Sequence, residues 1–350
     1  MLLWGVVMLA LMWGEQHAYD HFQPLRGYSP LHAHIMSQQE GLFLGLFNVL
    51  GTLAALSLGF AGFVLLRRKS PTDLPERLLV KRGDRLLVIL LSLAAAMGSA
   101  MVGFFVLEQA FLTDDEQAML FQARLLEEGR LFAQQTPFPA AFRYAMIVAA
   151  PRWYGIYPPG HPAIMALSLL LTGNPRVLLA LVAAGWVAMT FLLCRKLYDR
   201  STALLAALLL CLSPFFVLSS GSMAAELTSG FFLLLALNLV VRLEGPRPRL
   251  LALALGLSLG LAYLSRPYTA LALGVPMSLW VAYLWFRRRT DAWVPILALA
   301  TAIPCVLAYL LNNAALTGSP WLTPYQVNFP DQFRKGFVPV SYTHNRAHET

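Results

Sequence analysis

The sequence predicts an all-α fold, a polytopic bundle of about eight to nine transmembrane helices. Hydrophobic residues make up 58% of the 350 residues and charged residues only 13%, whereas soluble domains have roughly 25% charged residues. Apolar runs close to the ~20 residues needed to cross a bilayer recur along the chain. These observations argue against a water-soluble fold and for a chain that lies mostly in the membrane.

Eight apolar runs are expected to cross the membrane. Their approximate bounds are 42–66, 86–107, 176–194, 201–218, 227–243, 250–265, 268–286 and 293–311. The opening run, from Met1 to Trp13, is short for a span and lacks the basic start and small-residue cleavage site of a signal peptide. It is either a tilted ninth helix or a wrongly assigned start of the chain.

Short basic connections predict the orientation of these spans. Lys and Arg cluster in the connections near residues 67–85, 195–200, 242–249 and 287–289. If the first connection is cytoplasmic, the alternation of spans puts all four on that side, as the positive-inside rule requires. The net charge of +8 therefore indicates topology, and nucleic acid is not an expected partner.

The same alternation leaves a long loop, about residues 108–175, on the external side. A connection of this length is uncommon unless it is functional or disordered, and its aromatic composition is not that of a disordered segment. Apolar residues recur near helical spacing from Asp114 to Gly129, and a second such segment runs from His161 to about Leu171. We expect two juxtamembrane amphipathic helices here, covering the external mouth of the bundle.

An acidic triplet, Asp114, Asp115 and Glu116, opens the first of these helices. Adjacent carboxylates repel one another, which raises the pKa of at least one and suits a general base or a cation site. Acidic residues also stabilise a helix N-terminus, with Thr113 or Asp114 as the cap. The sequence leaves both interpretations open.

Arginine and tyrosine residues gather before the second loop helix, around the paired prolines Pro158 and Pro159. Arg152, Tyr154, Tyr157 and His161 are the side chains expected to bind substrate there, because guanidinium forks and phenol hydroxyls can hold a lipid phosphate. A snorkelling arginine within an interfacial aromatic belt is the alternative.

Two charged residues, Glu226 and Arg266, lie at the external ends of predicted spans. Charges near the membrane interior are costly and often functional, so both are expected to bind substrate, although either could simply pair with a neighbour. Four histidines, His17, His21, His32 and His34, precede the first span, but nothing completes a metal-ligand spacing. Solvated loop residues are the preferred interpretation, and no metal site is predicted.

The order and spacing of four segments resemble the GT-C class of multi-spanning glycosyltransferases, particularly protein O-mannosyltransferase and aminoarabinose-transferase relatives. These are an acidic signature, a Pro-Pro motif, a Ser-Pro segment and an Arg-Pro step, at Asp115–Arg124, Tyr157–Pro162, Leu212–Glu226 and Leu264–Pro267. The resemblance covers roughly residues 86–325. It divides the chain into an N-terminal membrane segment, 1–85, a GT-C-like domain, 86–325, and a polar external tail, 326–350. The chain is then either a fragment or a compact member.

The resemblance implies a transferase with Asp115 as general base, and Asp114 or Glu116 in that role if the register is shifted by one. The implied donor is a polyprenyl-phosphate-linked sugar, and the acceptor is a hydroxyl on a glycan, lipid or protein. Single displacement predicts inversion at the anomeric carbon. Relatives commonly have a basic residue where this chain has Tyr157, so phosphate binding is expected instead from Arg152 or Arg266.

The implied location is a bacterial-type inner membrane, with the active site facing the periplasm or exterior. No cofactor is implied with certainty, and the need for a divalent metal is open. A secondary transporter or lipid flippase is an alternative function, although the charges lie at span ends and no repeated halves are visible. A noncatalytic subunit on the same scaffold is a further alternative.

Overall fold

The computed structural model describes residues 82–330, except residues 109, 112, 136–137, 139–143 and 145. The run from Met1 to Trp13, the histidine cluster, the predicted span at 42–66 and the end of the tail after residue 330 lie outside the described residues. The domain boundaries proposed at residues 85 and 325 stay predictions.

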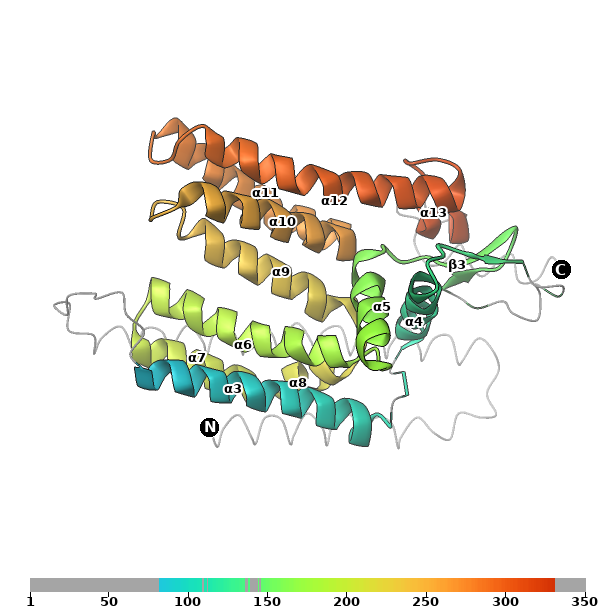
Figure 1. Cartoon of the computed structure of the whole chain (residues 1–350), viewed down its shortest axis with the longest axis horizontal. Helices are drawn as coiled ribbons and strands as arrows, with labels where there is room; N and C mark the ends of the chain where they lie inside the picture. Colours follow the sequence, from blue (N-terminus) through green and yellow to red (C-terminus); the bar gives the residue numbers. More distant parts are fainter. Residues whose placement is uncertain are drawn as a thin grey trace, which may run out of the picture. The chain divides into compact units, whose positions relative to one another are not determined.

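Every apolar run predicted from residue 86 onward forms helix. α3 continues directly into a short π-helix, η2, and seven further helices follow, most of them lying lengthwise in Figure 1. In order, these elements are α3 (Arg82–Met101), η2 (Val102–Val106), α6 (Val177–Leu197), α7 (Arg200–Cys211), α8 (Pro214–Gly221), α9 (Ala225–Val240), α10 (Pro248–Ser265), α11 (Pro267–Phe286) and α12 (Trp293–Thr317).

Within the described residues, five helices are long and apolar enough to cross a membrane. The pair α7 and α8 makes a sixth span if it is counted as one, although it bends by 58°. The bend falls at Ser213 and Pro214, because proline cannot continue the preceding helix. α9 has only 16 residues. The chain is thus a multi-pass membrane protein, but the predicted count of eight to nine spans is not confirmed.

Helices α4 (Asp114–Glu127) and α5 (Gly160–Thr172) form at the two loop positions where helices are predicted. They lie together at one end of the lengthwise helices, beside the short helix α13 (Pro324–Asn328), as Figure 1 shows. Their binding to a membrane surface stays a prediction.

A small antiparallel sheet in the same loop corrects the purely α prediction. β1 (Ala133–Gln134) and β2 (Ile147–Val148) flank β3 (Arg152–Gly155), with Val148 opposite Tyr154. The strands have two to four residues, so they show no alternation that sequence could reveal. Their pairing satisfies backbone groups that a loop between α4 and α5 would otherwise leave without partners.

The basic connections between α6 and α7, α9 and α10, and α11 and α12 all lie at the end opposite α4 and α5 (Figure 1). Ion pairs join neighbouring elements at that end: Arg200 with Asp84 at 2.5 Å, Arg249 with Asp291 at 2.9 Å, and Arg289 with Glu244 at 3.1 Å. The structure therefore separates a basic end from the end that holds the long loop.

α10 and α12 pack closely together, and small residues make this approach possible. A Cβ on Gly256 would overlap the carbonyl group of Ala298, and one on Gly260 would lie 2.7 Å from Cβ of Cys305. Glycine at a helix interface lets two backbones approach, which is how membrane helices gain packing energy.

We expect Gly256→Ala to lower the free energy of unfolding by about 1–3 kcal/mol, because α10 and α12 must separate to admit the methyl group. Thermal unfolding of the purified protein in detergent measures the change. Gly274→Ala on α11 is the matched control, since its nearest neighbour, Cδ2 of Leu259, would be at an ordinary 3.5 Å. Equal unfolding temperatures for the two variants would contradict the close approach.

Candidate functional site

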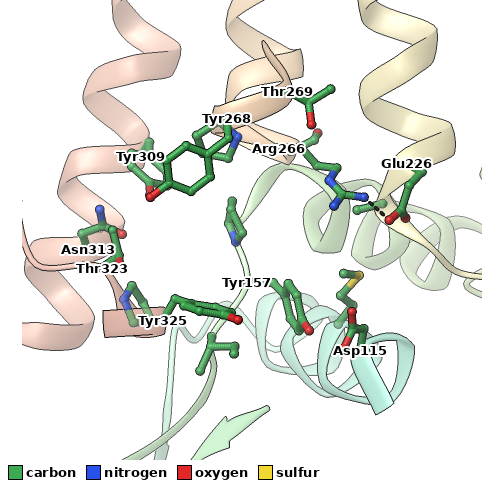
Figure 2. Close-up of a pocket in the computed structure, with 17 residues that line it drawn as sticks. Asp115, Tyr157, Glu226, Arg266, Tyr268, Thr269, Tyr309, Asn313, Thr323 and Tyr325 are labelled. Carbon is green, nitrogen blue, oxygen red and sulfur yellow. Dashed lines mark ion pairs between the residues drawn. The ribbon is translucent and has the colours of Figure 1, made fainter. Parts of the chain in front are cut away.

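A cavity of about 380 Å³ opens at the end of the bundle that holds the long loop. α4, the segment before α5, the start of α9, the break between α10 and α11, the end of α12, and α13 all contribute to its walls (Figure 2). Its polar lining residues are Asp115, Tyr157, Glu226, Ser265, Arg266, Tyr268, Thr269, Tyr309, Asn313, Thr323 and Tyr325.

The three carboxylates of the acidic triplet point in different directions, because successive helical residues are rotated by about 100°. Asp115 lines the cavity. Asp114 is exposed, and its Oδ1 accepts a hydrogen bond of 2.7 Å from the Tyr144 hydroxyl. The Glu116 side chain is only 1% exposed. Of the three, Asp115 alone can meet a ligand in the cavity.

The capping interpretation of the triplet receives partial support. Thr113 is the N-cap residue of α4, but its side chain makes no capping hydrogen bond. All three carboxylates lie in the first turn, where negative charge interacts favourably with the helix dipole. Stabilising the helix end and placing Asp115 in the cavity are therefore compatible roles.

Glu116 faces a buried arginine that sequence reasoning did not single out. Arg176, at the start of α6, is 6% exposed and donates from Nη2 to the Ala110 carbonyl at 2.7 Å. Burial lowers the pKa of Arg176, and the negative charge of Glu116 opposes this shift. A Cβ on Gly103 would lie 2.9 Å from Cδ of this arginine. Arg176 thus connects the start of α6 to the segment before α4. The sequence feature that could have indicated it is a charged residue beside an apolar run.

Tyr157 links the acidic helix to the Pro-Pro segment. Its hydroxyl hydrogen-bonds to Asp115, and its carbonyl accepts from Nε2 of Gln122 at 2.8 Å. Burial raises the pKa of Tyr157, and the bond to Asp115 raises it further. The phenol therefore stays protonated and donates to the Asp115 carboxylate, holding it at the cavity wall.

Arg266 occupies the break between α10 and α11. It is non-helical, with φ −148° and ψ 88°, and Pro267 begins α11 at the position that proline favours. Its Nη1 forms an ion pair with Oε1 of Glu226, in the first turn of α9. Figure 2 shows the pair at the cavity wall, across the cavity from Tyr325.

Three predicted substrate-binding residues do not line the cavity. Arg152 donates to the Ala315 carbonyl, and its guanidinium carbon lies 4.4 Å from the centre of the Phe132 ring. Tyr154 is 2% exposed, within an apolar cluster. His161 is completely buried. These side chains join the loop to the bundle, and a direct role for them in binding stays a prediction.

His161 connects α5 to the start of α9. Nε2 lies 2.7 Å from the Met223 carbonyl, which can only accept, so Nε2 carries the proton. Nδ1 then accepts from the Thr228 hydroxyl at 2.8 Å. Burial lowers the pKa of His161 to about 4, and the imidazole is neutral.

Several cavity residues were not predicted from sequence, among them Tyr268, Thr269, Tyr309, Asn313, Thr323 and Tyr325. The sequence feature that could have indicated this wall is the pair Asn312 and Asn313 near the end of an apolar run, because amide side chains are costly in a membrane helix. In the described part of the chain, no group of three His, Cys, Asp or Glu residues could hold a metal ion.

With this geometry established, family comparison gives one match. Residues 157–311 match the family model of dolichyl-phosphate-mannose-protein mannosyltransferases. The resemblance to GT-C glycosyltransferases is thus confirmed over this segment, a little under half of the chain, which contains Tyr157, Glu226 and Arg266. Asp115 and Asn313 lie outside it. No curated protein and no solved structure gave a significant match.

We expect His161 to make stability depend on pH. Its pKa is about 4 in the folded protein and about 6.5 when unfolded, so the neutral imidazole stabilises the fold fully above pH 6.5. This contribution is lost as the pH falls through 4 and amounts to about 3 kcal/mol.

Thermal unfolding of the wild type and His161→Gln between pH 7.5 and pH 4 measures this effect. Glutamine can keep one donor and one acceptor without titrating. The wild type should lose more stability on acidification than the variant. Parallel pH profiles would show that His161 does not titrate as expected.

Proposed function

We propose that the protein is a glycosyltransferase that moves a sugar from a polyprenyl-phosphate donor to an acceptor hydroxyl. The observation that carries the proposal is the convergence of Asp115, from α4, and Arg266, from the α10–α11 break, on one cavity. The family match over residues 157–311 supports the reaction class. A carboxylate base and a phosphate-binding guanidinium are the two groups that this transfer needs.

The reaction is a single displacement. Asp115 accepts the proton of the acceptor hydroxyl as its oxygen forms a bond to the anomeric carbon. The bond from that carbon to the phosphate oxygen breaks, and its electron pair leaves with the carrier phosphate. Attack opposite the leaving group inverts the anomeric configuration. Tyr157 orients Asp115 through the hydrogen bond between them.

Arg266 stabilises the negative charge that develops on the leaving phosphate, because a guanidinium fork matches phosphate oxygens and stays charged. Arg152 was the alternative from sequence, but it is bonded to the Ala315 carbonyl and does not line the cavity. The apolar residues Met119, Ile156 and Pro324 line the same cavity and suit the first isoprene unit of a lipid carrier.

The proposed location of the reaction is the external face of a bacterial-type inner membrane. The cavity lies at the end of the bundle opposite the basic connections. Because such connections remain on the cytoplasmic side, the cavity opens toward the periplasm or exterior. The acceptor is a glycan, lipid or protein hydroxyl that arrives from that side.

Asp115→Asn is expected to reduce transfer by about 100-fold or more, the usual contribution of a general base. The assay follows radiolabelled mannose from dolichyl phosphate mannose, and from its glucose counterpart, in membranes with equal protein levels. Asp114→Asn is the matched control and should retain transfer, because Asp114 contacts Tyr144 outside the cavity. Full activity of Asp115→Asn would refute the base assignment.

Arg266→Gln is expected to weaken binding of dolichyl phosphate by about tenfold or more, since a charge-assisted bond contributes about 1.5–3 kcal/mol. Equilibrium binding to purified protein in detergent measures the dissociation constant. Arg152→Gln serves as the comparison and should leave it unchanged. If Arg152→Gln weakened dolichyl phosphate binding more than Arg266→Gln did, Arg152 would be the phosphate-binding residue.

A further inference from the structure

The cavity has two chemically different walls. Its charged lining residues, Asp115, Glu226 and Arg266, come from α4, α9 and the α10–α11 break. The wall formed by α12 and α13 is uncharged and presents Tyr309, Asn313, Thr323 and Tyr325 (Figure 2). Charged groups suit a phosphate and a reacting hydroxyl, whereas a neutral wall of amides, hydroxyls and aromatic rings suits a polyhydroxylated ring.

Asn313 is the best-defined group of this neutral wall. It is 1% exposed, and its Nδ2 donates to the Pro320 carbonyl at 3.3 Å. Its Oδ1 is buried and has no hydrogen-bond partner among the described residues. A buried acceptor without a donor costs free energy, so a hydroxyl that reaches it from the cavity is bound favourably.

α13 holds the neutral wall in place. The Thr323 hydroxyl accepts from the backbone N–H of Gln326 at 3.2 Å, and the Gln326 side chain accepts from the Thr323 N–H at 2.9 Å. This capping box fixes the start of a helix that carries Tyr325 into the cavity. The wall is thus set by its own hydrogen bonds before any ligand binds.

We infer that the α12–α13 wall is the subsite for the transferred sugar, with Asn313 Oδ1 accepting a hydrogen bond from a sugar hydroxyl. The inference rests on the proposed function. In a single displacement the acceptor oxygen, the anomeric carbon and the phosphate oxygen are aligned between Asp115 and Arg266. The rest of the sugar ring must extend sideways from this line, and the neutral wall borders that part of the cavity (Figure 2).

The donor sugar is favoured over the acceptor as the occupant of this wall. The sugar is bonded to the phosphate, so it must lie within the cavity when Arg266 holds that phosphate. An acceptor needs to bring only one hydroxyl to Asp115. Asn313, Thr323 and Tyr325 also lie beyond the segment that matches the family model, residues 157–311, so the match assigns them no role.

The test compares carriers with and without sugar on the same purified protein. The probes are dolichyl phosphate, dolichyl phosphate mannose and dolichyl phosphate glucose, with binding measured at equilibrium in detergent. Asn313→Ala should weaken binding of a sugar-bearing carrier by about tenfold, the value of one good hydrogen bond, and leave dolichyl phosphate binding unchanged. Asn312→Ala is the matched control, because Asn312 is also buried but does not line the cavity.

The outcomes separate the subsite from the proposed function. Unchanged dolichyl phosphate binding shows that Asn313→Ala remains folded. An equal loss for all three carriers, or no loss for any, would overturn the subsite while leaving the phosphate site intact. A rise confined to the KM of the acceptor would assign the wall to the acceptor instead. Wild-type protein that binds none of the carriers would refute the proposed function itself, and the subsite with it.

Discussion

The packing of α5 against the end of α10 and the start of α9 determines the geometry of the site. A Cβ on Gly160 would lie 2.6 Å from the backbone carbon of Leu264, so only glycine permits this approach. His161 then joins α5 to Met223 and Thr228 through its two ring nitrogens. α4 packs on α5 in a common apolar cluster. The distance between Asp115 and Arg266 therefore depends on Gly160, which is small enough to allow the approach, and on His161, which is uncharged.

Hydropathy predicted the helices well but not their geometry. Each apolar run from residue 86 onward became helix, because backbone groups in a membrane must be satisfied within the segment. The run at 201–218 was predicted as one span, yet the chain bends by 58° between α7 and α8. Composition does not distinguish a straight span from a broken one, and strands of two residues leave no periodic pattern.

The site was predictable where function depends on local sequence and unpredictable where it depends on tertiary contacts. Asp115, Tyr157, Glu226 and Arg266 were singled out from sequence, and all four line the cavity. Arg152 looked equally suitable for binding phosphate, but its guanidinium donates a hydrogen bond to a backbone carbonyl of α12, which is far along the chain. No local pattern indicates such a partner. The residues of the α12–α13 wall were missed for the same reason.

The ion pair between Glu226 and Arg266 has a consequence for turnover in the proposed reaction. Both side chains are well exposed, at 63% and 39%, so an anion that reaches Arg266 must compete with a carboxylate that is already there. For a lipid-phosphate donor, loss of the sugar turns a phosphodiester into a monoester with a charge approaching −2. In the proposed reaction, the spent carrier would therefore be attracted to Arg266 more strongly than the donor is. Competition from Glu226 would then oppose product inhibition at the step where the carrier leaves.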